Sequence, residues 1–315
     1  MIICVNLNAS VDKLYQVDSM VPGTVMRVKT VVNTPGGKGL NVARVAAKLG
    51  EKVIAIGFLG GFNGGYVLSM LKQEGVQSMF TLTDAETRSC INIHDASTGK
   101  HTEFLEPGCE VSLPDQEKFL AGFEALLPDC NIVSVSGSLP KGIAPGFYAE
   151  LIKTAKKFGK KLILDSSGEA LKAALREAPF MIKPNREELG QLLASLQSST
   201  APESREQLYG AMESLGKQGV EIVALSLGKE GVLVRTPGGL WHGITPDIPV
   251  VNTVGCGDSM LAGFAAGFNR NWDIEKTIAL ATAVSTANAL VAETGSFRQD
   301  DLDRLLKEVK VIRVS

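Results

Sequence analysis

The sequence predicts an α/β protein with a mostly parallel central sheet between two layers of helices, and a small β-sheet that serves as a lid. Three observations lead to this prediction. Short apolar runs rich in valine and isoleucine alternate with amphipathic stretches of helical length, which is typical of parallel strands joined by crossover helices. Two segments break this rhythm with shorter alternations of apolar and polar residues, as expected for an exposed sheet. The chain of 315 residues offers ample core for such a fold.

Buried strands are expected at the short apolar runs. These runs cover residues 53–58, 132–135, 162–164, 180–182 and 222–227. The opening residues, 1–6, are predicted to form a first strand, because no basic segment followed by a long apolar stretch marks a signal peptide.

The amphipathic stretches between the strands are predicted to be helices. The clearest are residues 40–49, 66–74 and 147–158, which are followed directly by Gly50, Gly75 and Gly159. A glycine at this place can adopt the left-handed conformation that ends many helices.

The expected lid takes its strands from about residues 12–34 and 88–106. In the second segment, residues 97–100 are predicted to form the turn of a hairpin. The polar stretch at 195–203 is predicted to be a loop. No internal repeat or domain linker is evident, so residues 1–315 are expected to form a single domain.

The composition excludes several classes of function. With 32 Lys and Arg residues against 34 Asp and Glu residues, the net charge of −2 gives no overall field that attracts nucleic acid or an anionic membrane. Five scattered cysteines without a Cys-x-x-Cys pair, and three histidines, argue against a disulfide framework or a zinc site. No apolar run approaches the ~18 residues of a membrane span. We therefore expect small-molecule partners and a cytoplasmic location.

The strongest local signal for chemistry is a glycine turn at the start of a small-residue helix. Gly255 and Gly257 let backbone N–H groups gather round an anion at the helix N-terminus, where the macrodipole favours negative charge. Asp258 follows directly, and in phosphoryl transfer it could accept the proton of the attacking hydroxyl. The alternative is that Asp258 only caps its helix. Cys256 has no histidine partner nearby and is interpreted as a small residue rather than a nucleophile.

A second glycine-rich helix entrance covers residues 34–43. Its glycines, Gly37 among them, allow a ligand to approach the backbone closely. Lys38 supplies a positive charge, and Asn41 offers a donor and an acceptor for a sugar hydroxyl. The spacing is not that of a Walker loop or a dinucleotide fingerprint, and close helix packing is the alternative reason for the glycines.

Polar clusters follow four of the predicted strands. They are Ser136-Gly137-Ser138, Asp165-Ser166-Ser167, the stretch from Lys183 to Glu188, and Ser226-Leu227-Gly228. Because ligands bind outside the carboxyl ends of the strands in open parallel sheets, these clusters are expected to share one edge. Glu188 could hold Mg²⁺ through water, since Mg²⁺ prefers oxygen ligands and keeps several waters. The alternative interpretation of Glu188 is an acidic residue in the first turn of a helix, where its charge complements the helix dipole.

Candidate substrate contacts lie in and near the lid. Asp12 could accept hydrogen bonds from two vicinal sugar hydroxyls, or it could be a turn aspartate. Arg27, Lys29 and Arg88 could clamp a substrate phosphate, with a solvated surface charge as the alternative for each. We expect that phosphate to lie on Lys38, Arg88 and Arg27.

Taken in order, these motifs resemble the PfkB branch of the ribokinase family over essentially the whole chain. The resemblance rests on Gly36-Gly37-Lys38-Gly39-x-Asn41, Asn185-x-x-Glu188 and Gly255-x-Gly257-Asp258. It implies a ribokinase-like three-layer sandwich with a β lid, ATP and Mg²⁺ as cosubstrates, Asp258 as the base and residues 255–257 as the anion hole.

The same resemblance implies a set of ligand contacts. ATP contacts are expected at Lys183, Asn185, Ser226, Gly228, Gly231 and Asn288, with the metal at Glu188. Sugar contacts are expected at Asp12, Gly37, Asn41 and Ser138.

Within that family the chain looks like the branch that contains 1-phosphofructokinase and tagatose-6-phosphate kinase. The residues involved are the 36–41 motif, Thr87-Arg88, Thr102-Glu103 and residues 136–140. The implied reaction is phosphorylation of a ketohexose phosphate by ATP. Fructose 1-phosphate is the first expected acceptor, tagatose 6-phosphate the second and fructose 6-phosphate the third. The motifs do not separate the first two, because turning the furanose ring over exchanges its two CH₂ arms and gives the same phosphate-to-hydroxyl relation.

Two further expectations concern class and assembly. An inactive sugar-phosphate or nucleotide sensor is the alternative from a different class, and the intact Asp258 argues against it, since a binding module has no need of a carboxylate beside a bound phosphate. A homodimer formed through the lid is expected, because the open edges and outer face of a small sheet require cover.

Overall fold

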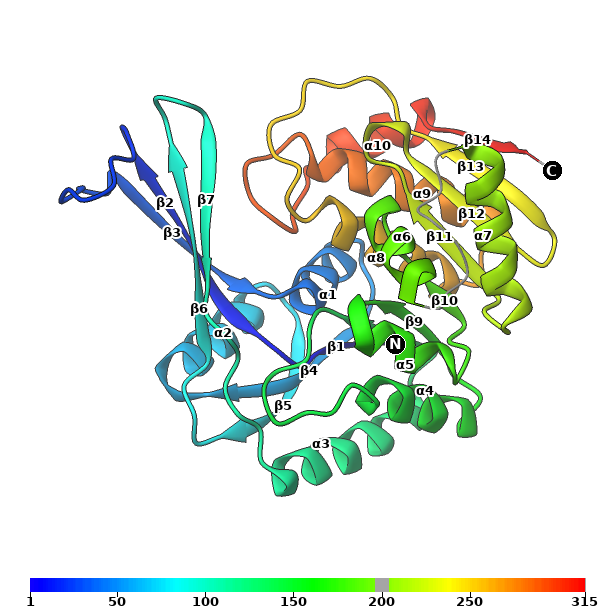
Figure 1. Cartoon of the computed structure of the whole chain (residues 1–315), viewed down its shortest axis with the longest axis horizontal. Helices are drawn as coiled ribbons and strands as arrows, with labels where there is room; N and C mark the ends of the chain where they lie inside the picture. The colour runs from blue at the N-terminus through cyan, green and yellow to red at the C-terminus, as the bar shows by residue number, and fades with distance from the viewer. Residues whose placement is uncertain (196–203, 315) are drawn as a thin grey trace.

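A large sheet organises the fold (Figure 1), as seen in a computed structural model that describes residues 1–195 and 204–314. Within these residues the order of its strands is β14 (Lys310–Arg313), β13 (Gly239–Ile244), β12 (Val232–Thr236), β11 (Ile222–Ser226), β10 (Met181–Ile182), β9 (Lys161–Asp165), β8 (Ile132–Ser136), β1 (Ile2–Asn6), β4 (Val53–Gly60) and β5 (Gln77–Thr83). The strands from β5 to β11 are parallel to their neighbours, and β12, β13 and β14 continue the sheet antiparallel. The predicted mostly parallel sheet is confirmed; the antiparallel edge was not predicted.

Helices cover the sheet. They are α1 (Lys38–Lys48), α2 (Gly61–Gln73), α3 (Leu113–Leu126), α4 (Phe147–Lys157), α5 (Gly168–Leu175), α6 (Arg186–Ser195), α7 (Arg205–Lys217), α8 (Cys256–Asn269), α9 (Ile274–Asn288) and α10 (Gln299–Glu308). Gly50, Gly75 and Gly159 have positive φ just beyond α1, α2 and α4, as the sequence predicted. Of the loop predicted at 195–203, Ser195 ends α6 and the remainder lies outside the described residues. None of the described helices is long and apolar enough to cross a membrane.

Alternate residues of β1 point into two separate hydrophobic cores. Ile2 and Cys4 belong to the core formed with α1, α8, α9 and α10. Ile3 and Val5 belong to the core on the opposite face, formed with α3 to α7. A strand that is buried on both faces is apolar throughout, which explains why the opening residues show no polar alternation. The layers are therefore helix, sheet and helix, as predicted.

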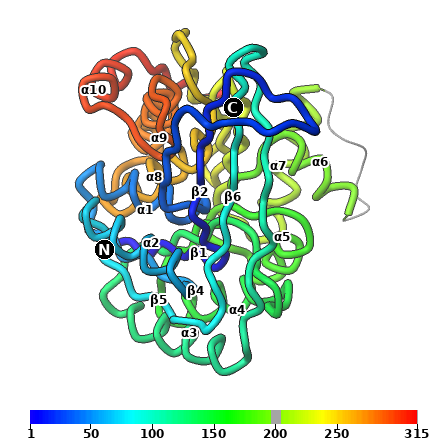
Figure 2. The backbone as a smooth tube through the Cα atoms, turned by 90° about the vertical axis from the view of Figure 1, so that its left-hand side faces the viewer, coloured from blue at the N-terminus to red at the C-terminus, as the bar shows by residue number. Residues whose placement is uncertain are grey.

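Four further strands form a separate small sheet that stands beside the main body (Figure 1, Figure 2). Their order is β3 (Thr30–Gly36), β2 (Ser10–Val17), β6 (Arg88–Asp95) and β7 (Lys100–Leu105). β2 pairs antiparallel with β3 and parallel with β6, and β6 pairs antiparallel with β7. The strands come from the two segments in which the apolar and polar residues alternate, and the predicted small sheet is confirmed.

The carboxyl ends of the parallel strands meet at one edge of the large sheet. Asn6 ends β1, Ser136 ends β8, Asp165 ends β9 and Ser226 ends β11. β1 lies between β4 and β8, so the chain crosses over in opposite directions on its two sides. Such a switch point is where open α/β sheets bind ligands.

Candidate active site

A left-handed glycine opens α8 and places Asp258 in the interior. Gly255, the residue before the helix, has φ 83°, a conformation that glycine adopts without a steric penalty. A Cβ at this position would lie 2.8 Å from Thr294 Cγ2 and 2.9 Å from Gly295 N, so the turn also lacks room for a side chain. Asp258 follows in the first helical turn with 7% of its surface exposed. The unpaired N–H groups at this helix end suit an anion.

The pKa of Asp258 is raised to about 7 by its surroundings. Burial is the largest cause, and the charge of Asp165 adds to it. The hydrogen bond from Asn41 and the charges of Lys38 and Lys183 act in the opposite direction. A carboxylate with a pKa near 7 is well matched to general-base chemistry at neutral pH.

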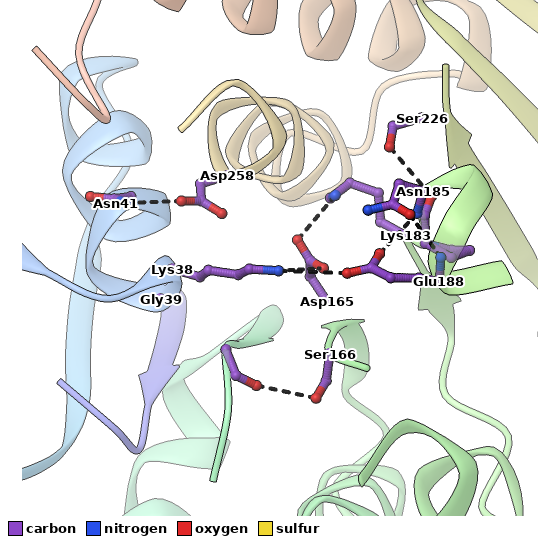
Figure 3. Close-up of polar contacts among 12 residues, drawn as sticks. Lys38, Gly39, Asn41, Asp165, Ser166, Lys183, Asn185, Glu188, Ser226 and Asp258 are labelled. Atoms are coloured by element: carbon purple, nitrogen blue, oxygen red, sulfur yellow. Dashed lines mark hydrogen bonds and ion pairs between the residues drawn. The ribbon is translucent and has the colours of Figure 1, made fainter. Parts of the chain in front are cut away.

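Asn41 reaches Asp258 from α1. Its Nδ2 donates a hydrogen bond of 2.8 Å to Asp258 Oδ2 (Figure 3). Asn41 is itself 6% exposed, so this contact is shielded from water. The sugar contact expected for Asn41 stays a prediction; in the structure its amide group orients the Asp258 carboxylate.

The glycine motif before α1 packs against the end of β1. Gly37 has φ 105°, and a Cβ there would lie 2.6 Å from Asn6 Nδ2. Asn6 Oδ1 accepts a hydrogen bond of 3.2 Å from Gly39 N. Close packing is therefore one reason for these glycines, and it fixes where Lys38 and Asn41 leave the helix.

Asp165 carries an ion-pair network near Asp258 (Figure 3). Its Oδ2 lies 3.0 Å from Lys183 Nζ, and both side chains are almost fully buried. Its Oδ1 lies 3.6 Å from Lys38 Nζ, and the same ammonium is 3.9 Å from Glu188 Oε1. Asp165 raises the pKa of Lys38 against the lowering effect of burial. Charged groups from α1, β9, α6 and the segment after β10 therefore converge at one place.

Glu188 and Asn185 form a reciprocal cap at the start of α6. Glu188 Oε2 accepts a hydrogen bond of 2.9 Å from Asn185 N, and Asn185 Oδ1 accepts one of 2.8 Å from Glu188 N. This is the pattern of a capping box, so the helix-end interpretation of Glu188 holds for one of its oxygens. The other oxygen, Oε1, faces Lys38. The carboxylate thus combines a structural oxygen with one that faces the site.

Asp12 lies on β2, directly opposite Cys90 of β6, and is therefore a strand residue and not a turn aspartate. Its Oδ1 accepts a hydrogen bond of 2.7 Å from Ser10 Oγ. Burial raises the pKa of Asp12, and the charge of Arg88 partly opposes this shift. Asp12 and Arg88 are therefore close enough to influence each other.

Arg88 is held by two backbone carbonyls at the base of the small sheet. Its Nη1 donates to Glu106 O and its Nη2 donates to Asn8 O, each at 3.0 Å. Asn8 Nδ2 in turn donates to Ser138 Oγ at 3.1 Å. Hydrogen bonds thus link Arg88 of the small sheet, through Asn8, to Ser138 in the segment after β8.

Arg27 lies in the exposed connection between β2 and β3, at the end of the small sheet that points away from the large one (Figure 1). Nearby, Lys29 pairs with Asp18 at 2.5 Å. Arg88 lies beside Ser10 at the other end of β2. Arg27 and Arg88 are therefore found at opposite ends of this strand, and a phosphate site shared by Arg27, Arg88 and Lys38 stays a prediction.

Most of the residues expected to contact ATP follow β10 and β11, whereas Asn288 ends α9. Asn185 forms an isolated β-bridge with Ser226, and Ser226 Oγ donates to Pro184 O at 3.4 Å. Gly228, with φ 60°, begins a short 3₁₀ turn, and Gly231, with φ 91°, follows it. These positions lie on the side of the site that carries Lys183 and Glu188.

Asn288 lies behind the glycine turn and is fully buried. Its Nδ2 donates to Val254 O at 3.0 Å and to Cys256 Sγ at 3.5 Å, and its Oδ1 accepts from Ser259 Oγ at 3.0 Å. Asn288 therefore supports the turn from inside. Burial raises the pKa of the Cys256 thiol, which agrees with its interpretation as a small residue.

Sequence reasoning named Asp165 in a polar cluster but gave it no role. The signal available was an acid at the carboxyl end of a buried strand, and only the three-dimensional arrangement reveals its two lysine partners. Asn6 was likewise missed as the side chain that anchors the glycine motif.

Comparison with known proteins identifies the family of the chain. Residues 5–300 match the model of the pfkB family carbohydrate kinases. The chain is 38% identical to a tagatose-6-phosphate kinase of Staphylococcus epidermidis over 317 aligned positions, covering 100% of both chains. The chain belongs to the pfkB family and is a carbohydrate kinase.

Solved structures show the same fold. Phosphofructokinase-2 of Escherichia coli in complex with fructose-6-phosphate superposes with a TM-score of 0.88 at 27% identity, covering 98% of each chain. Ribokinase of Arabidopsis thaliana complexed with ribose and ATP superposes with a TM-score of 0.77 at 22% identity, covering 97% of this chain and 98% of that chain. The ribokinase-like α/β fold predicted from the sequence is therefore confirmed.

Proposed function

We propose that the protein transfers the γ-phosphoryl group of Mg·ATP to a ketohexose monophosphate and so forms the bisphosphate. The observation that carries this proposal is the buried Asp258 with its pKa raised to about 7, set at a glycine turn and facing Lys38 and Lys183. A base, an anion-binding helix end and cations in one place are what phosphoryl transfer requires.

The residues present suit a magnesium ion that is shared with phosphates. Among the described residues, no group of three or more His, Cys, Asp or Glu side chains could hold a metal by itself. Mg²⁺ at nucleotide sites is commonly held by one or two carboxylates together with phosphate oxygens and waters, and Asp165 and Glu188 supply such a pair around Lys38. When bound, the ion would neutralise charge on the ATP phosphates.

In the proposed reaction the sugar phosphate lies between the small sheet and the large one. Asp12 receives ring hydroxyls, and Arg88 and Ser138 receive the phosphate that the sugar already carries. The free CH₂OH faces Asp258, which takes the hydroxyl proton while a P–O bond forms to the sugar oxygen and the bond from the γ-phosphorus to the bridging oxygen of ADP breaks. Closure of the small sheet over the sugar would exclude water, which otherwise competes as acceptor.

Three acceptors are candidates, each on different grounds. Tagatose 6-phosphate is favoured by the 38% identity to a tagatose-6-phosphate kinase. Fructose 1-phosphate, the first expectation from the sequence, presents the same phosphate-to-hydroxyl relation when its ring is turned over. Fructose 6-phosphate is the third candidate, because the similar structure of phosphofructokinase-2 was solved in complex with it.

A coupled ADP-release assay tests the proposed function. We expect kcat/KM with Mg·ATP to be at least tenfold higher for one of tagatose 6-phosphate, fructose 1-phosphate and fructose 6-phosphate than for fructose or ribose. Preference for an unphosphorylated sugar would contradict a phosphate site at Arg88. Binding of sugar phosphate without ADP release would instead indicate a sensor.

We also propose that two copies associate through the small sheet. Val31, Val32, Phe104 and Leu105 on its strands are between 46% and 63% exposed, and β3 and β7 are open edges in the described residues. Exposed apolar side chains and unpaired edges favour association. Light scattering should give twice the monomer mass, and Phe104→Glu should shift it towards the monomer; an unchanged mass in that variant would place the interface elsewhere.

A further inference from the structure

Two of the three histidines of the chain form a pair on the small sheet. His94 of β6 lies directly opposite His101 of β7, close to the hairpin turn that joins these strands at the end of the sheet away from the main body (Figure 1). The centroids of the two imidazole rings are 4.8 Å apart, and the ring planes are inclined by 32°. His101 is exposed and His94 is half-buried, so an ion from the solvent can reach both rings.

The histidine pair is separate from the candidate active site. Asp12 of β2 lies beside Cys90 of β6, and His94 follows Cys90 by four residues on the same strand. Side chains alternate between the two faces of a strand, so His94 shares a face with Cys90 and lies roughly 13 Å further along the strand. The pair therefore lies well away from the carboxylates that are proposed to hold Mg²⁺.

Asn92 holds the ring of His101 and determines which of its nitrogens is free. Asn92 Nδ2 donates a hydrogen bond of 3.2 Å to Glu103 Oε1, and Asn92 Oδ1 faces His101 Nδ1 at 2.8 Å. An amide oxygen only accepts hydrogen bonds, so Nδ1 carries the hydrogen and Nε2 of the neutral ring keeps its lone pair. Metal-binding histidines are commonly held in this way, by a hydrogen bond to the nitrogen that does not bind the metal.

His94 offers a second nitrogen ligand. Within residues 1–195 and 204–314 its ring makes no hydrogen bond, so neither of its nitrogens is committed to another group. Bonds from zinc to imidazole nitrogen are about 2.0–2.1 Å long, so two nitrogens on one tetrahedral ion lie about 3.3 Å apart. Rings with centroids 4.8 Å apart reach this spacing through small rotations of the side chains, and the strands need not move.

The ligand atoms of the pair select the class of ion. Imidazole nitrogen suits Zn²⁺, Ni²⁺ and Cu²⁺, whereas Mg²⁺ prefers oxygen ligands. In the part of the chain that the structure describes, no third His, Cys, Asp or Glu side chain completes a metal-binding group with the pair. Water would therefore fill the remaining coordination positions of an ion bound here.

We propose that His94 and His101 form a binding site for one divalent transition-metal ion of the zinc and nickel type. His101 Nε2 and one ring nitrogen of His94 bind the ion, and Asn92 orients the ring of His101. The ion joins β6 to β7 beside their turn and so restrains the hairpin of the small sheet. This site does not depend on the proposed kinase reaction.

Calorimetric titration of the whole chain with Ni²⁺ tests the site, in an excess of Mg²⁺ and without a histidine tag. We expect one Ni²⁺ per chain and at least a tenfold loss of affinity in His94→Gln and in His101→Gln. Asn92→Ala leaves both ligands in place and removes only the outer hydrogen bond, which should weaken binding by about 10–100-fold. Lys100→Gln changes the exposed neighbour of His101; it is the matched control and should bind Ni²⁺ like the wild type.

Hydrogen exchange gives a second readout that reports on the hairpin itself. Ni²⁺ should slow the exchange of backbone amides in residues 90–105 of the wild-type protein, because the ion joins the two strands, and it should leave residues 222–244 of the large sheet unchanged. In His101→Gln the metal should have no effect on either region. Thermal melts in metal-free buffer check that each variant is folded, and His101→Asn replaces His101→Gln if it is not.

The outcomes separate this inference from the proposed function. If the wild-type protein binds no Ni²⁺, or if His94→Gln and His101→Gln bind it as tightly as the wild type, the inference is overturned and the two rings form only a cross-strand contact. Half an equivalent of Ni²⁺ per chain would indicate an ion shared by two copies and would also overturn a site within one chain. Kinase activity without Ni²⁺ binding contradicts this inference alone, and Ni²⁺ binding without kinase activity contradicts only the proposed function.

Discussion

The side chain of Asn41 donates a 2.8 Å hydrogen bond to Asp258, although 217 positions separate the two residues. The bond connects the first turns of α1 and α8, the two helices that begin at glycine-rich motifs. It joins the motif expected to bind sugar to the motif expected to bind phosphate. The two motifs therefore act as one structural unit around the base.

This bond leads to a prediction about pH dependence. Because the pKa of Asp258 is about 7, and the base must be unprotonated, kcat/KM should rise with pH and level off above about 7. The hydrogen bond from Asn41 lowers that pKa, so Asn41→Ala should move the rising limb to higher pH. Profiles measured from pH 5.5 to 9 with both proteins check the prediction, and a limb that moves to lower pH would contradict it.

A second prediction concerns stability. A carboxyl group with a higher pKa in the folded than in the unfolded state binds its proton more tightly when folded, so its stabilising contribution is lost as the pH rises. For Asp258 this loss occurs between pH 3.8, the ordinary pKa, and about pH 7, the pKa in the folded protein. Over this range the contribution to the free energy of unfolding falls by roughly 4 kcal/mol. Asp258→Asn should therefore unfold at higher temperature than wild type at pH 8 and lose this advantage near pH 4. An equal Tm for the two proteins at pH 8 would count against the raised pKa.

The two oxygens of Glu188 can be tested separately. Gln is accepted at this position of a capping box, so Glu188→Gln should keep Tm within about 1–2 °C while the Mg²⁺ concentration for half-maximal activity increases severalfold. Glu188→Ala removes the cap as well, which destabilises by about 1 kcal/mol. Magnesium titrations and thermal melts of both variants provide the measurement. If Glu188→Gln left the magnesium requirement unchanged, Glu188 would have only its role as a helix cap and none in binding magnesium.

Close packing of α8 on α9 yields a prediction about the fold. A Cβ on Gly263 would lie 2.5 Å from Ala281 Cα, whereas nothing lies within 4 Å of the position of a Cβ on Gly65 in α2. Gly263→Ala should therefore destabilise by about 1–3 kcal/mol through overpacking. Gly65→Ala should be neutral or stabilise by up to about 1 kcal/mol, because alanine favours the helix. Urea unfolding of both variants compares them, and equal midpoints would show that α8 can move aside.

Local patterns in the sequence were sufficient for much of the fold. Continuous apolar runs predicted β4, β8, β9 and β11, and glycines marked the ends of α1, α2 and α4, because burial on both faces and left-handed helix ends leave local signals. The strands β12 to β14 were not predicted. Their pairing depends on where the chain returns to the sheet edge, which no local pattern encodes.

The sequence predicted individual residues of the candidate site, but it did not predict which of them contact one another. Asp258 and its glycines were identified because a helix N-terminus, a left-handed turn and an acid are adjacent in the chain. The partners of Asp165 were not identified, since Lys38 and Lys183 reach it from distant segments. Arg27 is the opposite case. Its residue type suits a phosphate clamp, but it lies in the exposed connection after β2, and Arg88 lies at the other end of that strand.

The central claim is that Asp258 is the base in phosphoryl transfer, and the most direct test is the turnover of Asp258→Asn with saturating Mg·ATP and the best sugar phosphate. Asn keeps an oxygen that can accept the hydrogen bond from Asn41, so the fold and the binding of both substrates, followed by calorimetry, should be preserved. The account predicts a loss of 10²–10⁴-fold in kcat. A folded variant that binds both substrates and turns over at near wild-type rate would contradict it.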